Sequence, residues 1–296
     1  MANREIVAIR AMLTQDPTKM SLAELRAAYD ALGAAFPIPP DVTVRAEDGC
    51  GAHAEWGTTP DANESHVILY LHGGGYAIGS LASHRGLVAA LGRAARTRTL
   101  ALDFRLAPEA PFPAAVDDAL AAYRFLLDQG IKHSAIAIAG DSAGGGLTVA
   151  TLVAAREAGL PQPACGVCIS PWMDLEMLGD TMKTKASEDP LVTQSLLQAW
   201  SSAYLNNADP RNPLASPLHA NLKELAPLLI QVGSAEILLD DSIRLAAAAS
   251  AQEVSVRLEA WPEMIHVWHL FHPILADARR ALASAGVFVQ ERMRSN

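Results

Sequence analysis

Cysteine and long apolar runs are the two things this sequence has least of. The 296 residues include three cysteines, and no apolar run reaches the roughly 18–20 residues that cross a bilayer. So few cysteines cannot form a disulfide framework in a chain of this length, and they are typical of a reducing compartment. Residues 1–20 also lack the continuous apolar core and the small-residue cleavage pattern of a secretory signal. These absences predict a cytoplasmic protein with no membrane partner.

Basic residues are scarce as well. Lys and Arg total 23 against 32 Asp and Glu, which gives a net charge of -9, and the basic residues do not cluster. This balance repels phosphate backbones and anionic lipids, so nucleic acid is excluded as the expected partner. Because 50% of the residues are hydrophobic and 19% are charged, the composition is that of a globular protein and excludes a mainly disordered chain.

Two of the cysteines, Cys165 and Cys168, have the spacing of a redox pair or of half a zinc site. No second pair accompanies them, and they lie in an apolar run that predicts a strand, where positions i and i+3 face opposite sides. Buried structural thiols are therefore the better interpretation.

Short apolar runs alternate with longer helical patterns from about residue 40 onward. The expected strands are 42–45, 66–71, 99–103, 134–139, 165–169, 228–232 and 254–258, and the expected helices are 81–95, 114–128, 143–158, 242–252 and 273–294. Several of the strand-like runs are apolar on both faces, as strands covered by helices on both sides must be. The order predicts an α/β fold with a mostly parallel central sheet and helices on both faces.

Two regions break this alternation. Residues 1 to about 35 predict two helices, and residues 187 to about 215 predict a helix with a loop rich in Pro and Asn, inserted between two strands. Neither region fits the regular winding of the sheet, so we expect both to lie over one edge of it.

A candidate nucleophile lies between an expected strand and an expected helix. Gly140-Asp-Ser-Ala-Gly144 fits the pattern G-x-S-x-G, which in this strand–turn–helix context forms a nucleophile elbow. The turn strains the serine backbone, and small flanking residues permit the close packing. Ser142 would then stand above the sheet at the amino end of a helix, where negative charge is favoured.

A second motif supplies candidate oxyanion donors. The strand 66–71 runs directly into His72-Gly-Gly-Gly75, where backbone N–H groups are not shielded by side chains. We expect the oxyanion to be held by N–H groups of Gly73, Gly74 and Gly75 together with that of Ala143, the residue after the nucleophile. A phosphate-binding loop is the alternative, but the P-loop Lys and the G-x-G-x-x-G spacing are absent. His72 precedes the wrong element for a catalytic base and is expected to organise this loop.

These motifs together resemble the hormone-sensitive-lipase family of α/β-hydrolase esterases. The resemblance rests on His72-Gly-Gly-Gly75 and Gly140-Asp-Ser-Ala-Gly-Gly145, with Phe104-Arg-Leu-Ala-Pro-Glu109 and Phe112-Pro-Ala-Ala115 between them. It extends from about residue 40 to the C-terminus. It implies an α/β-hydrolase catalytic domain over residues 36–296, whose helical cap consists of residues 1–35 and an insertion at about 187–215. The triad residues would be spread over this one domain.

The triad acid is expected after the strand 228–232, where three carboxylates compete. Asp240 and Asp241 fall near the start of a helix, where acidic residues are favoured in any case. Laid against the family's Asp-Pro-Leu pattern, Glu236-Ile-Leu-Leu-Asp240 puts Glu236 at the acid position, a departure from the usual Asp. Glu236 is thus preferred, with Asp240 as the alternative.

The base is expected in the loop after the next strand. His266, in Trp261-Pro-Glu-Met-Ile-His266, resembles the family's catalytic histidine. His269 and His272 follow it and are expected to be packed or solvated, and His84 and His133 match no motif.

The resemblance implies a serine carboxylesterase that hydrolyses short- to medium-chain esters through an acyl-enzyme, without metal or organic cofactor. Tyr76, Trp200 and Tyr204, with Met182, are candidate walls of the substrate pocket, although each fits a core position equally well. The family's bacterial members suggest a homodimer through the last strand. Two alternatives stay open. One is a small-molecule receptor on the same scaffold, as in the plant gibberellin receptor, which lacks the catalytic histidine. The other is an amidase or acyltransferase with the same triad.

Overall fold

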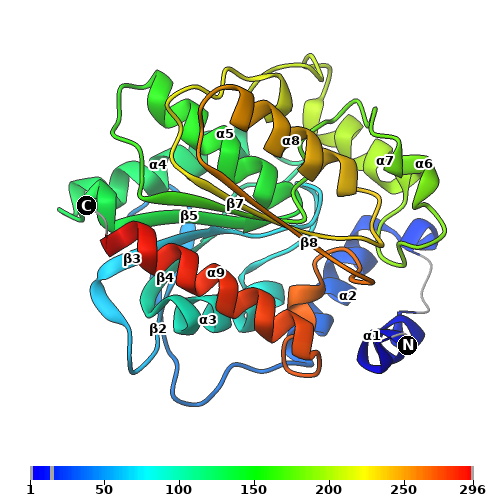
Figure 1. The fold of residues 1–296 in the computed structure, drawn as a ribbon, viewed down its shortest axis with the longest axis horizontal. Coiled ribbons are helices and arrows are strands. Elements are labelled where there is room, and N and C mark those ends of the chain that lie inside the picture. The colour runs from blue at the N-terminus through cyan, green and yellow to red at the C-terminus, as the bar shows by residue number, and fades with distance from the viewer. Residues whose placement is uncertain (1–2, 14–16, 295–296) are drawn as a thin grey trace.

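One eight-stranded sheet forms the centre of the computed structural model, which describes residues 3–13 and 17–294 (Figure 1). The strand order is β1-β2-β4-β3-β5-β6-β7-β8. The pairs β1–β2 and β2–β4 are antiparallel, and all other neighbours are parallel. The strands are β1 (Thr43–Glu47), β2 (His53–Thr58), β3 (Asn63–Leu71), β4 (Thr97–Asp103), β5 (Ile136–Asp141), β6 (Cys165–Ile169), β7 (Leu228–Gly233) and β8 (Val256–Trp261). The predicted mostly parallel α/β architecture is confirmed.

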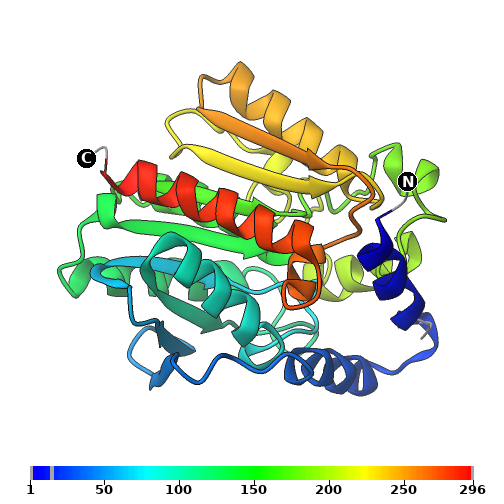
Figure 2. The same cartoon turned by 60° about the horizontal axis from the view of Figure 1, so that its bottom comes forward.

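Helices cover both faces of this sheet (Figures 1 and 2). On one face α3 packs against α9, and on the other lie α4, α5 and α8. The helices are α1 (Arg4–Met12), α2 (Leu22–Ala34), α3 (Leu81–Ala95), α4 (Ala114–Asp128), α5 (Ala143–Glu157), α6 (Thr181–Thr184), α7 (Gln194–Leu205), α8 (Leu239–Ala251) and α9 (Ala276–Arg294). Short 3-10 turns are η1 (Pro17–Lys19), η2 (His133–Ala135), η3 (Pro217–His219) and η4 (Trp268–Phe271).

The apolar residues of the central strands divide between two cores. In β5, Ile136 and Ile138 join the core beneath α4, α5 and α8, whereas Ala137 and Ala139 join the core beneath α3 and α9. This alternation follows from the two-residue period of a strand, and each fully buried Ile contributes about 1.5–3 kcal/mol. The double coverage buries every residue of β5, and Ser142 follows directly after it.

The two spaced cysteines behave as predicted. Cys165 and Cys168 are both buried and free, and they belong to opposite cores. Burial raises the pKa of each thiol to about 12. They are structural residues of β6.

The structure differs from the prediction at the sheet edges. The sequence pattern did not predict β2, whose short run His53–Thr58 mixes charged and apolar residues. This strand lies between β1 and β4 near one edge of the sheet. The last strand begins at Val256 instead of residue 254, and α8 begins at Leu239 instead of residue 242.

The two predicted regions outside the regular winding contain α1 and α2, and α7. With α6, which precedes the second region, these helices gather beyond the carboxyl ends of the parallel strands, on the right in Figure 1. Residues 1–2 and 14–16 of the expected N-terminal cap segment lie outside the described residues. In the described chain, no helix combines the length and apolarity that crossing a membrane requires.

Candidate active site

The turn between β5 and α5 holds Ser142 in a strained conformation, with φ 54° and ψ -120°. A non-glycine residue with positive φ is uncommon, and such strain concentrates at functional sites. The Ser142 N–H donates to the Ile169 carbonyl (2.8 Å), and the Ser142 carbonyl accepts from the N–H of Trp172 (2.9 Å). A Cβ at Gly140 or Gly144 would collide with the Leu71 carbonyl, so the elbow requires glycine on both sides.

Ser142, His266 and Glu236 form a hydrogen-bonded chain. His266 Nε2 lies 3.0 Å from Ser142 Oγ, and His266 Nδ1 lies 3.3 Å from Glu236 Oε1. The other carboxylate oxygen of Glu236 accepts the Ser170 hydroxyl (2.8 Å) and the Gly233 N–H (3.0 Å). All three residues of the chain are buried. Glu236 is thereby fixed in one orientation, with one oxygen directed at the imidazole.

The two competing carboxylates make other contacts. Asp240 accepts the Thr181 N–H (3.0 Å), and Asp241 accepts the N–H groups of Met173 (2.7 Å) and Asp174 (3.0 Å). Both therefore hold the segment after β6 and its continuation into α6.

The electrostatics of the chain favour a basic imidazole. Burial alone lowers the pKa of His266, but the hydrogen bond and negative charge of Glu236, together with the charges of Asp189 and Asp141, raise it above its usual value. Burial raises the pKa of Glu236, and its hydrogen bond with His266 offsets part of that rise. Because the pKa values of both residues are raised, the Glu236–His266 pair binds a proton more readily than the two isolated side chains would.

The oxyanion loop departs from the expectation at its first glycine. The Gly73 N–H donates to Asp141 Oδ1 (3.1 Å), so this donor is already engaged. Within the described part of the chain, the N–H groups of Gly74, Gly75 and Ala143 donate to no protein acceptor. Gly74 and Gly75 have φ values of 116° and 62°, a conformation that favours glycine. The three remaining expected donors are therefore the ones available to an anion.

Asp141 connects the nucleophile elbow to the oxyanion loop. Besides the Gly73 N–H, its carboxylate accepts the Tyr70 hydroxyl (2.8 Å) and lies 3.3 Å from His84 Nε2. Burial tends to raise the pKa of Asp141, but the charge and hydrogen bond of His84 and the bond from Tyr70 lower it overall. Sequence reasoning found no role for His84, because its partner is 57 residues away in the chain.

His72 organises the loop, as expected. Its Nδ1 lies 2.8 Å from the Gly73 carbonyl, and its ring stacks on Phe104 with centroids 4.3 Å apart. Burial lowers the pKa of His72 to about 4, so the ring is neutral at pH 7. Ala107 belongs to the same segment, Phe104–Glu109. Its N–H donates to the Tyr76 carbonyl (2.8 Å), and this bond fixes the residue that follows the oxyanion loop.

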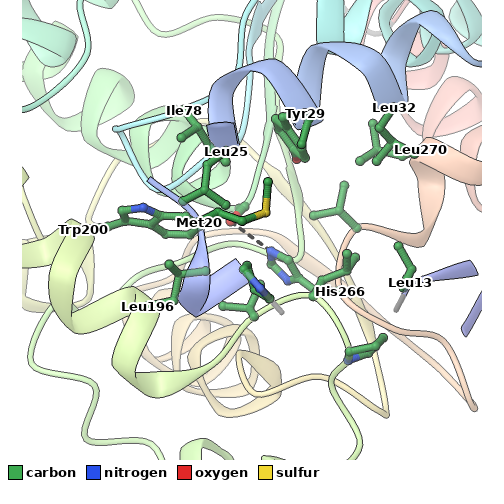
Figure 3. A pocket seen from close by; sticks show the side chains of 18 of the residues that line it. Leu13, Met20, Leu25, Tyr29, Leu32, Ile78, Leu196, Trp200, His266 and Leu270 are labelled. Atoms are coloured by element: carbon green, nitrogen blue, oxygen red, sulfur yellow. Dashed lines mark hydrogen bonds between the residues drawn. The ribbon is translucent and has the colours of Figure 1, made fainter. Parts of the chain in front are cut away.

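An apolar cavity of about 240 Å³ opens over Ser142 and His266 (Figure 3). Its walls come from α1, η1, α2, the segment before α7, α7 itself and the turn η4. The lining side chains include Leu13, Met20, Leu25, Tyr29, Leu32, Ile78, Leu196, Trp200 and Leu270. Apart from the triad residues, the described lining residues include one ionisable side chain, the Tyr29 phenol, whose pKa burial raises beyond the physiological range. The cavity suits an uncharged ligand.

Of the expected pocket residues, Trp200 lines the cavity, but Tyr76, Tyr204 and Met182 do not. The two tyrosine rings stack on each other with centroids 3.8 Å apart and are buried behind the oxyanion loop. Met182 is likewise buried in the core. Sequence position places these residues near the loop and the insertion, but the direction of each side chain is decided by tertiary packing.

Asp189 belongs to the site although no sequence pattern distinguishes it. It is buried, and it accepts the N–H groups of Ile237 (3.0 Å), Leu191 (3.0 Å) and Val192 (3.1 Å). These bonds fix the segment before α7 to the loop that carries Glu236. Its negative charge also raises the pKa of His266.

A metal ion would find three close ligand atoms among the described residues at Asp174, Glu176 and His219. None of these residues lines the cavity, and Asp174 already pairs with Arg244 at 2.7 Å. The group is separate from the chemistry at Ser142.

The chain is similar to known α/β hydrolases. A family profile described as the α/β-hydrolase fold matches residues 68–270. An acetyl-hydrolase of Streptomyces hygroscopicus is 49% identical over 268 residues, which cover 90% of this chain and 88% of that protein. The solved structure of an esterase of the bacterial hormone-sensitive-lipase family has a TM-score of 0.96 at 44% identity and covers 99% of both chains. The esterase EstE5, solved after soaking with p-nitrophenyl butyrate, has a TM-score of 0.95 at 46% identity and covers 99% of this chain and 100% of its own.

Proposed function

Because the chain belongs to the hormone-sensitive-lipase family of α/β hydrolases and is an esterase of the serine-hydrolase class, we propose that it hydrolyses short- to medium-chain carboxylic esters with Ser142 as nucleophile, His266 as base and Glu236 as acid. The observation that carries the assignment is the buried chain from Ser142 Oγ through His266 to Glu236, at 3.0 Å and 3.3 Å. It opens on an apolar cavity beside unengaged backbone donors.

Acylation begins when His266 Nε2 takes the Ser142 hydroxyl proton and the oxygen attacks the ester carbonyl carbon. The carbonyl electron pair moves to the carbonyl oxygen, which receives hydrogen bonds from the N–H groups of Gly74, Gly75 and Ala143. Each such donor is worth about 2.7–4 kcal/mol of transition-state stabilisation. The intermediate then collapses, and the alcohol leaves with the proton held on His266.

Deacylation repeats these steps with water. His266 removes a proton from water, the hydroxide oxygen bonds to the acyl carbon, and the Ser142 oxygen leaves with that proton as the carboxylic acid is released. Glu236 accepts the Nδ1–H of His266 throughout, which keeps Nε2 unprotonated in the resting enzyme and stabilises the imidazolium in each transition state.

The substrate range follows from the walls of the cavity. A volume of about 240 Å³ is below the roughly 300–1,000 Å³ of typical ligand pockets, and the lining is almost wholly apolar. These properties support small uncharged esters and disfavour charged acyl groups. p-Nitrophenyl butyrate, with which EstE5 crystals were soaked, is a small uncharged ester.

The test is hydrolysis of p-nitrophenyl acetate, butyrate and octanoate by the wild type and by Ser142→Ala, a substitution that removes one oxygen at a buried site. We expect turnover of butyrate by the wild type and a loss of at least about 10³-fold in the variant. Equal rates from the two proteins would refute the nucleophile assignment. Binding without turnover would favour the receptor alternative, and cleavage of p-nitroanilides at comparable rates would favour an amidase.

A homodimer through β8 is a separate proposal. β8 is the outer strand of the sheet and pairs with β7 along one edge, and Leu258 on it is 39% exposed. An open strand edge is a template for a second copy. Light scattering should give twice the chain mass for the wild type and the monomer mass for Leu258→Pro, and a monomeric wild type would contradict the proposal.

A further inference from the structure

We propose that a second apolar hollow, between η1–α2 and α7, holds the distal part of the substrate's acyl chain; this inference rests on the proposed esterase function. The hollow, called here the α2–α7 groove, has a volume of about 410 Å³ and is lined by Pro17, Thr18, Met20, Leu22, Leu25, Ala77, Pro108, Ser195, Leu196, Ala199, Trp200 and Ala203. It contains neither Ser142 nor His266.

The groove and the active-site cavity share a wall. Five residues line both hollows, namely Pro17, Met20, Leu25, Leu196 and Trp200. The two spaces are therefore neighbours on either side of these five residues. Taken together, the volumes fall within the roughly 300–1,000 Å³ of typical ligand pockets, which the cavity alone does not reach.

The shared wall contains an adaptable side chain. Met20 has an unbranched side chain with three rotatable bonds, which can change its rotamer at little cost. Figure 3 shows it between Leu25 and His266, where it reaches over the site. A change of the Met20 rotamer would join the cavity to the groove without moving the backbone.

The surroundings of the wall are fixed. The Arg26 guanidinium on α2 donates to the carbonyls of Ala77 (2.9 Å) and Ala107 (3.1 Å) and pairs with Glu109 at 2.7 Å. On the other side, the Trp200 ring lies directly against Gly75, where a Cβ would collide with it. The groove is thus held open by anchored elements on both sides.

The position of the wall selects the acyl chain over the alcohol. The leaving alcohol oxygen must lie beside His266 Nε2, because it takes its proton from there. In Figure 3, Trp200 and Leu196 lie on one side of His266, and Leu32 and Leu270 lie on the other. The shared wall belongs to the Trp200 side, next to Gly75 of the oxyanion loop. The acyl substituent points to that side, while the alcohol faces Leu270.

The chemistry of the groove fits a hydrocarbon. Among the residues that the structure describes, the lining contains no Asp, Glu, Lys, Arg or His, and its polar side chains are the hydroxyls of Thr18 and Ser195. An alkyl chain gains by leaving water for such a surface, whereas a charged group would find no counter-ion.

The experiment narrows the groove from α7 without touching the cavity. Ala199 and Ser195 line the groove but not the cavity, and both are exposed, so Ala199→Phe and Ser195→Phe should fold. Gln198→Phe is the matched control, because Gln198 is also exposed on α7 and lines neither hollow. kcat/KM is measured with p-nitrophenyl butyrate, p-nitrophenyl decanoate and decyl acetate.

Both groove variants should lower the decanoate-to-butyrate ratio of kcat/KM by roughly tenfold, which corresponds to the lost burial of about two methylene groups. Butyrate kinetics should stay within about twofold of the wild type in all three variants, and Gln198→Phe should leave the ratio unchanged. Conversely, Met20→Ala should raise the ratio, because the shared wall is removed.

Three outcomes would overturn the proposal. The first is an unchanged ratio in Ala199→Phe and Ser195→Phe with butyrate turnover intact, which leaves the esterase function standing. The second is a loss confined to acetate esters of long alcohols, which would put the alcohol in the groove. The third is no turnover of any ester by the wild type, which would overturn the proposed function as well.

Discussion

Replacing Glu236 by Gln tests the acid of the proposed triad. In the wild type, one carboxylate oxygen receives both the Ser170 hydroxyl and the Gly233 N–H, and the other faces His266 Nδ1. Glutamine has a single amide oxygen, and the Ser170 hydroxyl and the Gly233 N–H both need this oxygen as their acceptor. The amide NH₂ group then faces Nδ1, which must act as an acceptor. The ring proton consequently moves to Nε2, next to Ser142, where it blocks removal of the serine proton.

The structure sets the size of this effect. A triad imidazole locked in the wrong tautomer costs about 10⁴ in kcat. The side-chain amide can instead rotate so that its oxygen faces His266, but the Gly233 N–H then loses its acceptor in a buried site, which costs about 1–3 kcal/mol. The flipped amide also lacks the negative charge that stabilises the imidazolium. We therefore expect kcat to fall by about 10²–10⁴ in Glu236→Gln, with little change in KM.

Hydrolysis of p-nitrophenyl butyrate at saturating substrate measures this loss. Asp240→Asn is the matched control, since Asp240 accepts the Thr181 N–H at 3.0 Å and an amide oxygen can do the same. The control should retain kcat within about tenfold. A Glu236→Gln variant with kcat within about fivefold of the wild type, or a larger loss in Asp240→Asn, would refute the assignment of the acid.

Three further predictions concern the surroundings of the triad. Glu236, with the charges of Asp189 and Asp141, raises the pKa of His266 above 6.5 despite its burial. Because only the neutral ring accepts the serine proton, kcat/KM should rise with pH through a midpoint above 6.5, and a wild-type midpoint below 6 would contradict this. Asp141→Ala leaves two buried donors without an acceptor and should lower the free energy of unfolding in urea by about 2–6 kcal/mol, whereas Asp141→Asn should cost less. With pKa values of about 12, Cys165 and Cys168 should react with a thiol reagent at pH 8 only after denaturation, and fast reaction of either of these two thiols in the native protein, located by mass spectrometry, would exclude their burial.

Local patterns were enough to predict the central part of the fold. The limits of α3 and α4 agree with their expected ranges, because the apolar period and the flanking turn residues define them. The pattern of β2 is weaker, since His53 and Glu55 alternate with Ala54 and Trp56 in a strand of six residues. Its place between β1 and β4 depends on long-range pairing, which local patterns do not contain.

In the site, sequence motifs identify chain positions better than side-chain directions. The positions of Ser142 and His266 follow from the turn and loop that carry them, and the two side chains lie within hydrogen-bond distance. Tyr76 is next to the oxyanion loop in the sequence, yet its ring turns away and stacks on Tyr204. The engagement of the Gly73 N–H by Asp141 likewise depends on a contact across 68 residues.

The walls of the cavity and its reactive groups come from different parts of the chain. Met20, Leu25 and Trp200 belong to η1–α2 and α7, whereas Ser142 and His266 follow strands of the sheet. Single replacements in the first group can therefore change which esters are accepted and leave the reaction itself intact. Under selection, substrate preference can drift quickly while the chemistry stays constant. A library for altered specificity is best restricted to these wall positions.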